Sequence, residues 1–307
     1  MPNTKESDLL NEWKTEIALL ILRSNRNNEN IQTNFDYKIY LNRITRNELF
    51  TKSFDYLKLP RIHMEFDENY DTLSSFVDRN TPLQDWVQKK LRNLSFVNNP
   101  DAIVKMRIYA LNGLFQELGI HQSQEIESFL NPNVYEWSNW LTPTTVGKYP
   151  KFNTLYYLII LDTEDLMNDE SGLRSKGIWT SFDQISDPIP PNDFYELTKL
   201  SRFLTIANLR EYIENEYRQT AIEKVLPSIE HFNDGSIAFL PGDFLYPKYV
   251  PLIAKRLPRL HNETIEEFSR LSRKEFGSMN RIEIRGFNLK VKTSDSMELK
   301  NRMKPKF

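Results

Sequence analysis

The sequence of 307 residues contains no cysteine. This absence excludes disulfides, thiolate zinc sites and cysteine nucleophiles. Long hydrophobic runs are missing as well, because the longest ones, Ile17–Leu22 and Leu155–Leu161, are far shorter than the ~20 residues that a membrane-spanning helix needs. No membrane association is therefore expected.

An excess of charge of either sign is also missing. The chain has 40 basic and 42 acidic residues, and this balance argues against a broad surface for nucleic acid. The first residues are polar and form neither a signal peptide nor a transit peptide, and Met303–Phe307 is not a peroxisomal signal. The sequence predicts a folded cytoplasmic protein.

The N-terminal part predicts two strands, Ile17–Leu22 and Tyr37–Ile44, from their branched and aromatic residues. The asparagine-rich link from Ser24 to Asn34 is expected to be an exposed loop. Residues 46–99 alternate apolar patches with polar stretches, which predicts an irregular insertion with one or two short helices.

A helix is predicted from about residue 101 to residue 118. Asn99 suits the N-cap, Pro100 suits the first helical position, and Gly119 favours termination. Apolar residues recur at helical spacing between these ends: Ile103, Ala110, Leu111, Leu114 and Leu118. The apolar segment Phe152–Leu161 predicts a buried strand.

The C-terminal half predicts further helices and hairpins. They are a helix after Pro190-Pro191 with Phe194, Leu197, Leu200 and Leu204 on one face, helices at Ile206–Lys224 and near Thr264–Phe276, a hairpin at Asn233-Asp234-Gly235 and a strand pair in Arg281–Lys292. No Gly/Ser linker divides the chain. We therefore expect one α/β domain at 10–295, with flexible tails at 1–9 and 296–307.

Several segments match one known family in order and spacing. They are Tyr40-Leu41-Asn42-Arg43, Trp137–Pro143 followed by Lys151–Thr154, Trp179-Thr180-Ser181 followed by Pro190–Leu197, Leu240–Pro247, and Asn280–Glu283. Together they resemble the coenzyme A diphosphatase branch of the Nudix hydrolases, the nucleoside diphosphate-linked moiety X motif 19 type. The resemblance implies a Nudix-like α/β/α sandwich with a mixed sheet, an insertion before the metal-binding helix and a helical C-terminal elaboration. Trp137 and Trp140 are expected to be core residues.

The resemblance also implies a reaction. It is cleavage of coenzyme A or its thioesters, with Mg²⁺ or Mn²⁺, into 3′,5′-ADP and (acyl-)4′-phosphopantetheine. Such metals take oxygen ligands, which the family supplies from an Arg-Glu-x-x-Glu-Glu-x-Gly helix. The matching stretch here has Gly113 and Gln116 in place of the first two glutamates and keeps only Glu117. Leu57-Lys58-Leu59-Pro60 replaces the preceding glycine loop.

Three residues are candidate site residues by this resemblance. Glu117 is the candidate catalytic residue and metal ligand, and Gln116 is a weaker candidate ligand. Arg43 is the candidate substrate-binding residue, because a guanidinium binds phosphate through two hydrogen bonds, although a surface salt bridge is the simpler interpretation. Carboxylates at Glu65, Asp67, Glu68 and Asp71 could assist, but such a cluster is typical of a solvated face.

Three functional hypotheses stay open. The first is a divergent relative of coenzyme A diphosphatases whose turnover is weak or lost, with Mg²⁺ or Mn²⁺ as cofactor if it is active. The second is a pseudoenzyme with a degenerate active site that binds coenzyme A or a related nucleotide, or acts as a scaffold. The third is a hydrolase of another nucleotide diphosphate such as capped RNA.

Overall fold

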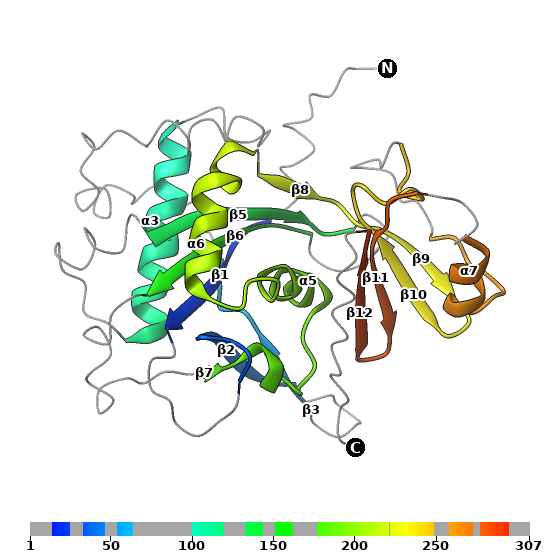
Figure 1. Ribbon diagram of the computed structural model, residues 1–307, viewed down its shortest axis with the longest axis horizontal. Helices are drawn as coiled ribbons and strands as arrows, with labels where there is room; N and C mark the ends of the chain where they lie inside the picture. The colour runs from blue at the N-terminus through cyan, green and yellow to red at the C-terminus, as the bar shows by residue number, and fades with distance from the viewer. Residues whose placement is uncertain are drawn as a thin grey trace.

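The computed structural model describes residues 14–24, 33–46, 54–63, 100–119, 133–143, 151–161, 177–220, 222–248, 258–272 and 277–294. Figure 1 labels their elements. The strands are β1 (Lys14–Ser24), β2 (Tyr37–Arg46), β3 (Phe54–Lys58), β4 (Arg61–His63), β5 (Val134–Leu141), β6 (Phe152–Leu161), β7 (Gly177–Thr180), β8 (Glu223–Val225), β9 (Ser228–Phe232), β10 (Gly235–Phe239), β11 (Asn280–Arg285) and β12 (Asn288–Thr293). The α-helices are α3 (Pro100–Leu118), α5 (Pro191–Leu200), α6 (Ile206–Asn215) and α7 (Ile265–Ser272), and short 3₁₀ turns cover Phe182–Gln184 and Tyr217–Gln219.

The main sheet is mixed. Its strands follow the order β3-β2-β1-β6-β5-β8, with β4 paired to β1 and β7 paired to β2. The pairs β1–β6 and β5–β8 are parallel, and the other pairs are antiparallel. β6 is a central strand, as its apolar sequence predicts, and the architecture belongs to the expected α/β class.

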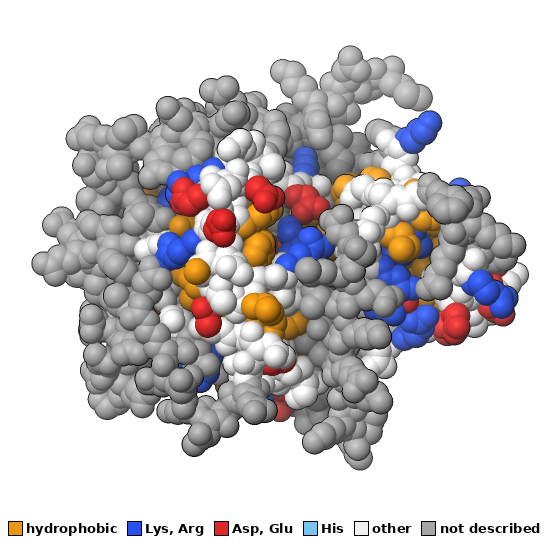
Figure 2. All heavy atoms as spheres, viewed as in Figure 1, with side chains coloured by type: hydrophobic (Ala, Val, Ile, Leu, Met, Phe, Trp, Pro, Cys, Tyr) orange, Lys and Arg blue, Asp and Glu red, His pale blue; other side chains and the backbone are white. Residues whose placement is uncertain are grey.

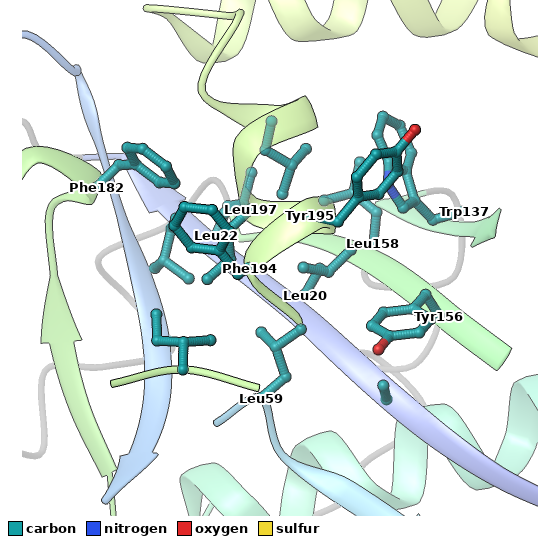
Figure 3. Packing of buried hydrophobic residues seen from close by; sticks show 14 of the residues in the cluster. Leu20, Leu22, Leu59, Trp137, Tyr156, Leu158, Phe182, Phe194, Tyr195 and Leu197 are labelled. Atoms are coloured by element: carbon teal, nitrogen blue, oxygen red, sulfur yellow. The ribbon is translucent and has the colours of Figure 1, made fainter. Parts of the chain in front are cut away.

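The two faces of the main sheet carry different helices. Alternate residues of a strand point to opposite faces, so β1 supplies side chains to both. Ile17, Leu19 and Ile21 pack with α3, whereas Ala18, Leu20 and Leu22 pack with α5 and α6. Figure 3 shows Phe194 and Leu197 of α5 over Leu20 and Leu22, and Tyr195 beside Trp137. The protein is thus a sandwich with helices on both sides of the sheet.

A second sheet forms the C-terminal part. It is antiparallel in the order β12-β11-β10-β9, and α7 packs on it through Ile265 and Phe268 (Figure 1). Leu289 and Val291 of β12 reach the main core. The C-terminal elaboration, which was expected to be helical, therefore combines one helix with a sheet.

Most predicted elements are confirmed, and three differ. The helix predicted to run to Lys224 ends at Asn215, because Glu223–Val225 instead forms β8 and pairs with β5. Leu204 lies beyond α5 and is 50% exposed, so it does not share that helical face. Within the predicted irregular insertion, β3 and β4 pair with β2 and β1 and belong to the main sheet.

Several predictions fall outside the described residues. They concern most of the loop from Ser24 to Asn34, the acidic cluster from Glu65 to Asp71, the possible short helices before Asn99, and both tails. Within the described ranges, none of the helices is both long and apolar enough to span a membrane.

Candidate functional site

The candidate site is built on α3, which packs on β1 and β4 and is followed by Gly119 with φ +66°. Glu117 lies in the last turn of this helix and is half-buried. Asn42 on β2 donates from Nδ2 to Glu117 Oε2 at 3.1 Å. The Tyr40 hydroxyl donates to the Glu117 carbonyl oxygen at 3.3 Å and accepts from the Gly177 amide at 3.0 Å. Strand β2 therefore fixes both the backbone and the carboxylate of Glu117.

Gly113 has a packing reason to be a glycine. A Cβ at this position would lie 1.9 Å from Cδ1 and 2.6 Å from Cγ1 of Ile62 on β4. A side chain here would force Ile62 to move, and a glycine avoids this at a cost of ~1 kcal/mol in helix propensity. Residue 113 is the position of the first glutamate in the family helix. Here it packs against β4 with no room for a side chain.

The other two candidate residues do not converge with Glu117. Gln116 is exposed on α3. Arg43 follows Asn42 on β2, so its side chain points to the opposite face of the strand. There its Nη2 donates to Asp187 Oδ2 at 3.2 Å, with half of the arginine side chain exposed. In this structure Arg43 makes the surface salt bridge that was the simpler interpretation.

The described residues do not fit a complete site for Mg²⁺ or Mn²⁺. Among them, no group of three His, Asp or Glu side chains could hold a metal ion. Beside the Glu117 carboxylate, the described residues offer Asn42 Oδ1, which is buried and has no hydrogen-bond partner. Magnesium prefers six oxygen ligands in an octahedron, so two protein groups are too few.

Asn42 is the residue that sequence reasoning missed. Its polar side chain is 9% exposed and lies between Tyr40 and Ile44 on one face of β2. The only available signal was an asparagine at an inward position of a predicted strand, between Leu41 and Arg43. The long-range contact with Glu117 could not be read from the sequence.

Two of the family-like segments meet at Glu196, which is fully buried on α5. Its carboxylate accepts hydrogen bonds from Trp137 Nε1 and Ser138 Oγ, each at 2.8 Å, and from Trp140 Nε1 at 2.5 Å. Lys199 Nζ lies 3.4 Å away. The tryptophans, expected in the core, are confirmed there and also anchor α5 to β5. In the segment Trp137–Pro143, residues up to Leu141 belong to strand β5.

Asp193 is the second buried carboxylate of α5. It accepts from the Leu59 amide at 3.1 Å, from the Tyr156 hydroxyl at 2.8 Å, and from the Arg61 guanidinium. Burial raises the pKa of Tyr156 well above its ordinary value, which keeps the hydroxyl protonated as a donor. Leu59 lies within the segment that replaces the glycine loop, and Arg61 follows that segment directly. Leu59 and Arg61 thus connect this part of the chain to α5 through a buried hydrogen bond and a buried ion pair.

Comparison with known proteins gives matches at modest identity. No family model matches the chain. The chain is 34% identical over 148 residues to the acyl-coenzyme A diphosphatase NUDT19 of Xenopus laevis, which covers 44% of this chain and 39% of that protein. The resemblance to the coenzyme A diphosphatase branch is confirmed. The human NUDT19 is 28% identical over 120 residues and the Gallus gallus NUDT19 31% over 125, each covering 37% of this chain and 32% of the relative.

The matched part is thus well under half of each curated relative. Two solved structures are also similar. A Nudix hydrolase from Alicyclobacillus acidocaldarius has a TM-score of 0.39 at 11% identity and covers 68% of this chain and 97% of that one. Shewanella oneidensis NrtR has a TM-score of 0.36 at 8% identity and covers 64% and 63%. The fold assignment rests on the described sheet and helices.

Proposed function

We propose that this protein is a divergent relative of acyl-coenzyme A diphosphatases in which diphosphate hydrolysis is weak or lost. The sequence similarity to NUDT19 supports the substrate class, which is coenzyme A or its thioesters. The state of α3 supports the weakness of turnover. Of its three family carboxylate positions, 113 packs on Ile62, 116 is an exposed glutamine, and 117 alone is acidic.

Charge gives the size of the expected effect. Three carboxylates offer −3 to a dication, whereas Glu117 offers −1. Losing a metal-bound group costs on the order of a few kcal/mol, and each ~1.4 kcal/mol lowers a rate tenfold. Two such losses amount to several orders of magnitude. The single carboxylate of α3 is therefore expected to support at most slow metal-dependent hydrolysis.

Binding without turnover is the second candidate function. The Glu196 and Asp193 networks hold α5 on the main sheet through protein hydrogen-bond donors. Arg43 is proposed to bind a phosphate of the ligand. Its ion pair with Asp187 is exposed, and exposed pairs are weak enough to exchange for phosphate. Hydrolysis of a capped RNA is kept as the third candidate.

A product assay tests this proposal. The full chain is incubated with coenzyme A, acyl-coenzyme A, NADH and capped RNA at physiological Mg²⁺, beside Glu117→Gln, and products are separated by chromatography. We expect negligible turnover of every substrate by both proteins. Robust turnover that Glu117→Gln abolishes would overturn the proposal. Calorimetry with coenzyme A then tests binding, which Arg43→Ala should weaken.

A further inference from the structure

A cleft of about 480 Å³ lies between the α5–α6 side of the molecule and the end of the C-terminal sheet. Its aromatic wall includes Tyr195 and Tyr212, and its other wall includes Asn280 and Thr293. Figure 2 shows basic side chains near the middle of this face, close to acidic and apolar ones. The volume is within the range typical of small-molecule sites, ~300–1,000 Å³.

Two cations line the cleft, Lys199 and Arg202. They differ in how far nearby carboxylates already neutralise their charge. Lys199 Nζ donates to Glu223 Oε2 at 2.8 Å and lies 3.4 Å from Glu196. Burial opposes its charge, but these carboxylates raise the pKa of Lys199 above its ordinary value. Arg202 is exposed and, in the described part of the chain, its side chain makes a single long hydrogen bond, 3.5 Å from Nη2 to Thr293 Oγ1. Its planar fork of donors suits a phosphate.

The aromatic wall is rigid and partly accessible. Tyr212 is half-buried, with its ring centroid 4.9 Å from that of Phe203 and 6.2 Å from that of Tyr217. Tyr217 in turn stacks on Trp137 at 5.0 Å, and its hydroxyl donates to the Trp137 carbonyl oxygen at 3.0 Å. A planar ring can stack on a surface held in this way, as bases do on aromatic side chains.

Glu223 supplies an acceptor in the same cleft. Its side chain is 37% exposed, and it uses Oε2 for the bond to Lys199. A ligand for this lining therefore needs an anionic group for Arg202, a planar ring for Tyr212, and an N–H or O–H donor for Glu223. A nucleoside monophosphate carries all three.

We propose that this cleft binds a nucleoside monophosphate, with its phosphate on Arg202, its base against Tyr212 and an amine or ribose hydroxyl donating to Glu223. The cleft belongs to the α5–α6 side of the main sheet, whereas Glu117 lies on α3 on the other side. The inference is therefore independent of the function proposed for the α3 face.

Calorimetry on the full chain tests the inference with AMP, adenosine and inorganic phosphate as ligands. We expect AMP to bind about tenfold or more tightly than adenosine, and phosphate alone to bind weakest. Arg202→Ala should weaken AMP about tenfold and leave adenosine nearly unchanged, because it removes the phosphate contact. Tyr212→Leu should weaken both. Arg285→Ala, which removes a half-exposed arginine of the C-terminal sheet, is the matched control and should leave AMP affinity unchanged.

Three outcomes would overturn the inference. The first is no heat with AMP at millimolar concentration in the folded wild type. The second is an AMP affinity that Arg202→Ala leaves intact. The third is loss of AMP binding in Glu117→Gln, which would locate the nucleotide at α3. Circular dichroism is the check that each variant is folded. The product assay with coenzyme A tests the function proposed for the α3 face and is evaluated separately from AMP binding.

Discussion

The two faces of the main sheet treat their carboxylates in opposite ways. On the α3 face, Glu117 is half-buried, and Asn42 is the one hydrogen-bond donor to its carboxylate among the described residues. On the α5 face, Asp193 and Glu196 are fully buried, and each accepts three hydrogen bonds. A carboxylate saturated by protein donors acts in stability, whereas one with spare lone pairs is open to a ligand. Sequence similarity to an enzyme branch therefore resides here partly in residues that build the fold.

The comparison predicts that the largest loss of stability follows from changing Glu196. In Glu196→Gln, three buried donors face an amide and Lys199 loses one of its two carboxylates. We expect the free energy of unfolding to fall by about 3–5 kcal/mol. Urea denaturation measures it. Glu214→Gln, at an exposed ion pair with Arg218, is the control and should cost less than ~1 kcal/mol. Equal losses of unfolding free energy in Glu196→Gln and Glu214→Gln would contradict the contrast between buried and exposed carboxylates.

Asp193 should come next, because it compensates the buried Arg61. Asp193→Asn is expected to lower the free energy of unfolding by about 3 kcal/mol, since it leaves a guanidinium buried without its main partner. The double variant Asp193→Leu with Arg61→Met should recover much of this loss, because it removes both charges. Thermal unfolding of the wild type, Asp193→Leu, Arg61→Met and the double variant checks it. Additive losses would show that the two side chains act separately.

Gly113 tests the α3 face by packing. Gly113→Ala gains ~1 kcal/mol of helix propensity but must displace Ile62, and overpacking costs about 1–3 kcal/mol. The expected net result is a destabilisation of about 1 kcal/mol. In an Ile62→Ala background, the same substitution should no longer destabilise the protein. Urea denaturation measures both. Gln116→Ala, at an exposed position of the same helix, should change little. A stabilised Gly113→Ala would mean that α3 and β4 do not approach closely.

The smallest effect on stability, and the sharpest on ligand binding, is expected at Asn42. Asn42→Asp places a second carboxylate beside Glu117 and removes the amide donor, so without metal the variant should lose about 1 kcal/mol by repulsion and the lost hydrogen bond. The wild-type melting temperature should barely respond to millimolar Mn²⁺, whereas that of Asn42→Asp should rise, because more oxygen charge binds a hard dication. Asn42→Leu is the control. A wild-type rise as large as that of the variant would show that a metal site already exists.

The sequence predicted those parts whose signals are local. The limits of α3 follow from Pro100 and Gly119, and the hairpin at Asn233-Asp234-Gly235 follows from its turn residues. The apolar run of β6 predicted its central place. The resemblance then added the order of the motifs and the α/β class.

The parts it missed depend on distant partners. β4 is three residues long and exists because it pairs with β1, and β8 likewise depends on β5. The reason for Gly113 lies in Ile62, and the role of Asn42 lies in Glu117. Each of these contacts joins segments far apart in the chain, so a local sequence pattern does not predict them.

The parallel pairing of β1 with β6 has a consequence for how the chain folds. Glu16 and Thr154 bond across these strands although 138 positions separate them. Contacts of such long sequence separation slow folding, because the loop must close before the pairing stabilises it. During synthesis β1 emerges first, and its run Ile17–Leu22 is buried on both faces in the finished protein. Until β6 is synthesised, this apolar strand lacks its parallel partner, and an unpaired strand of this kind favours aggregation.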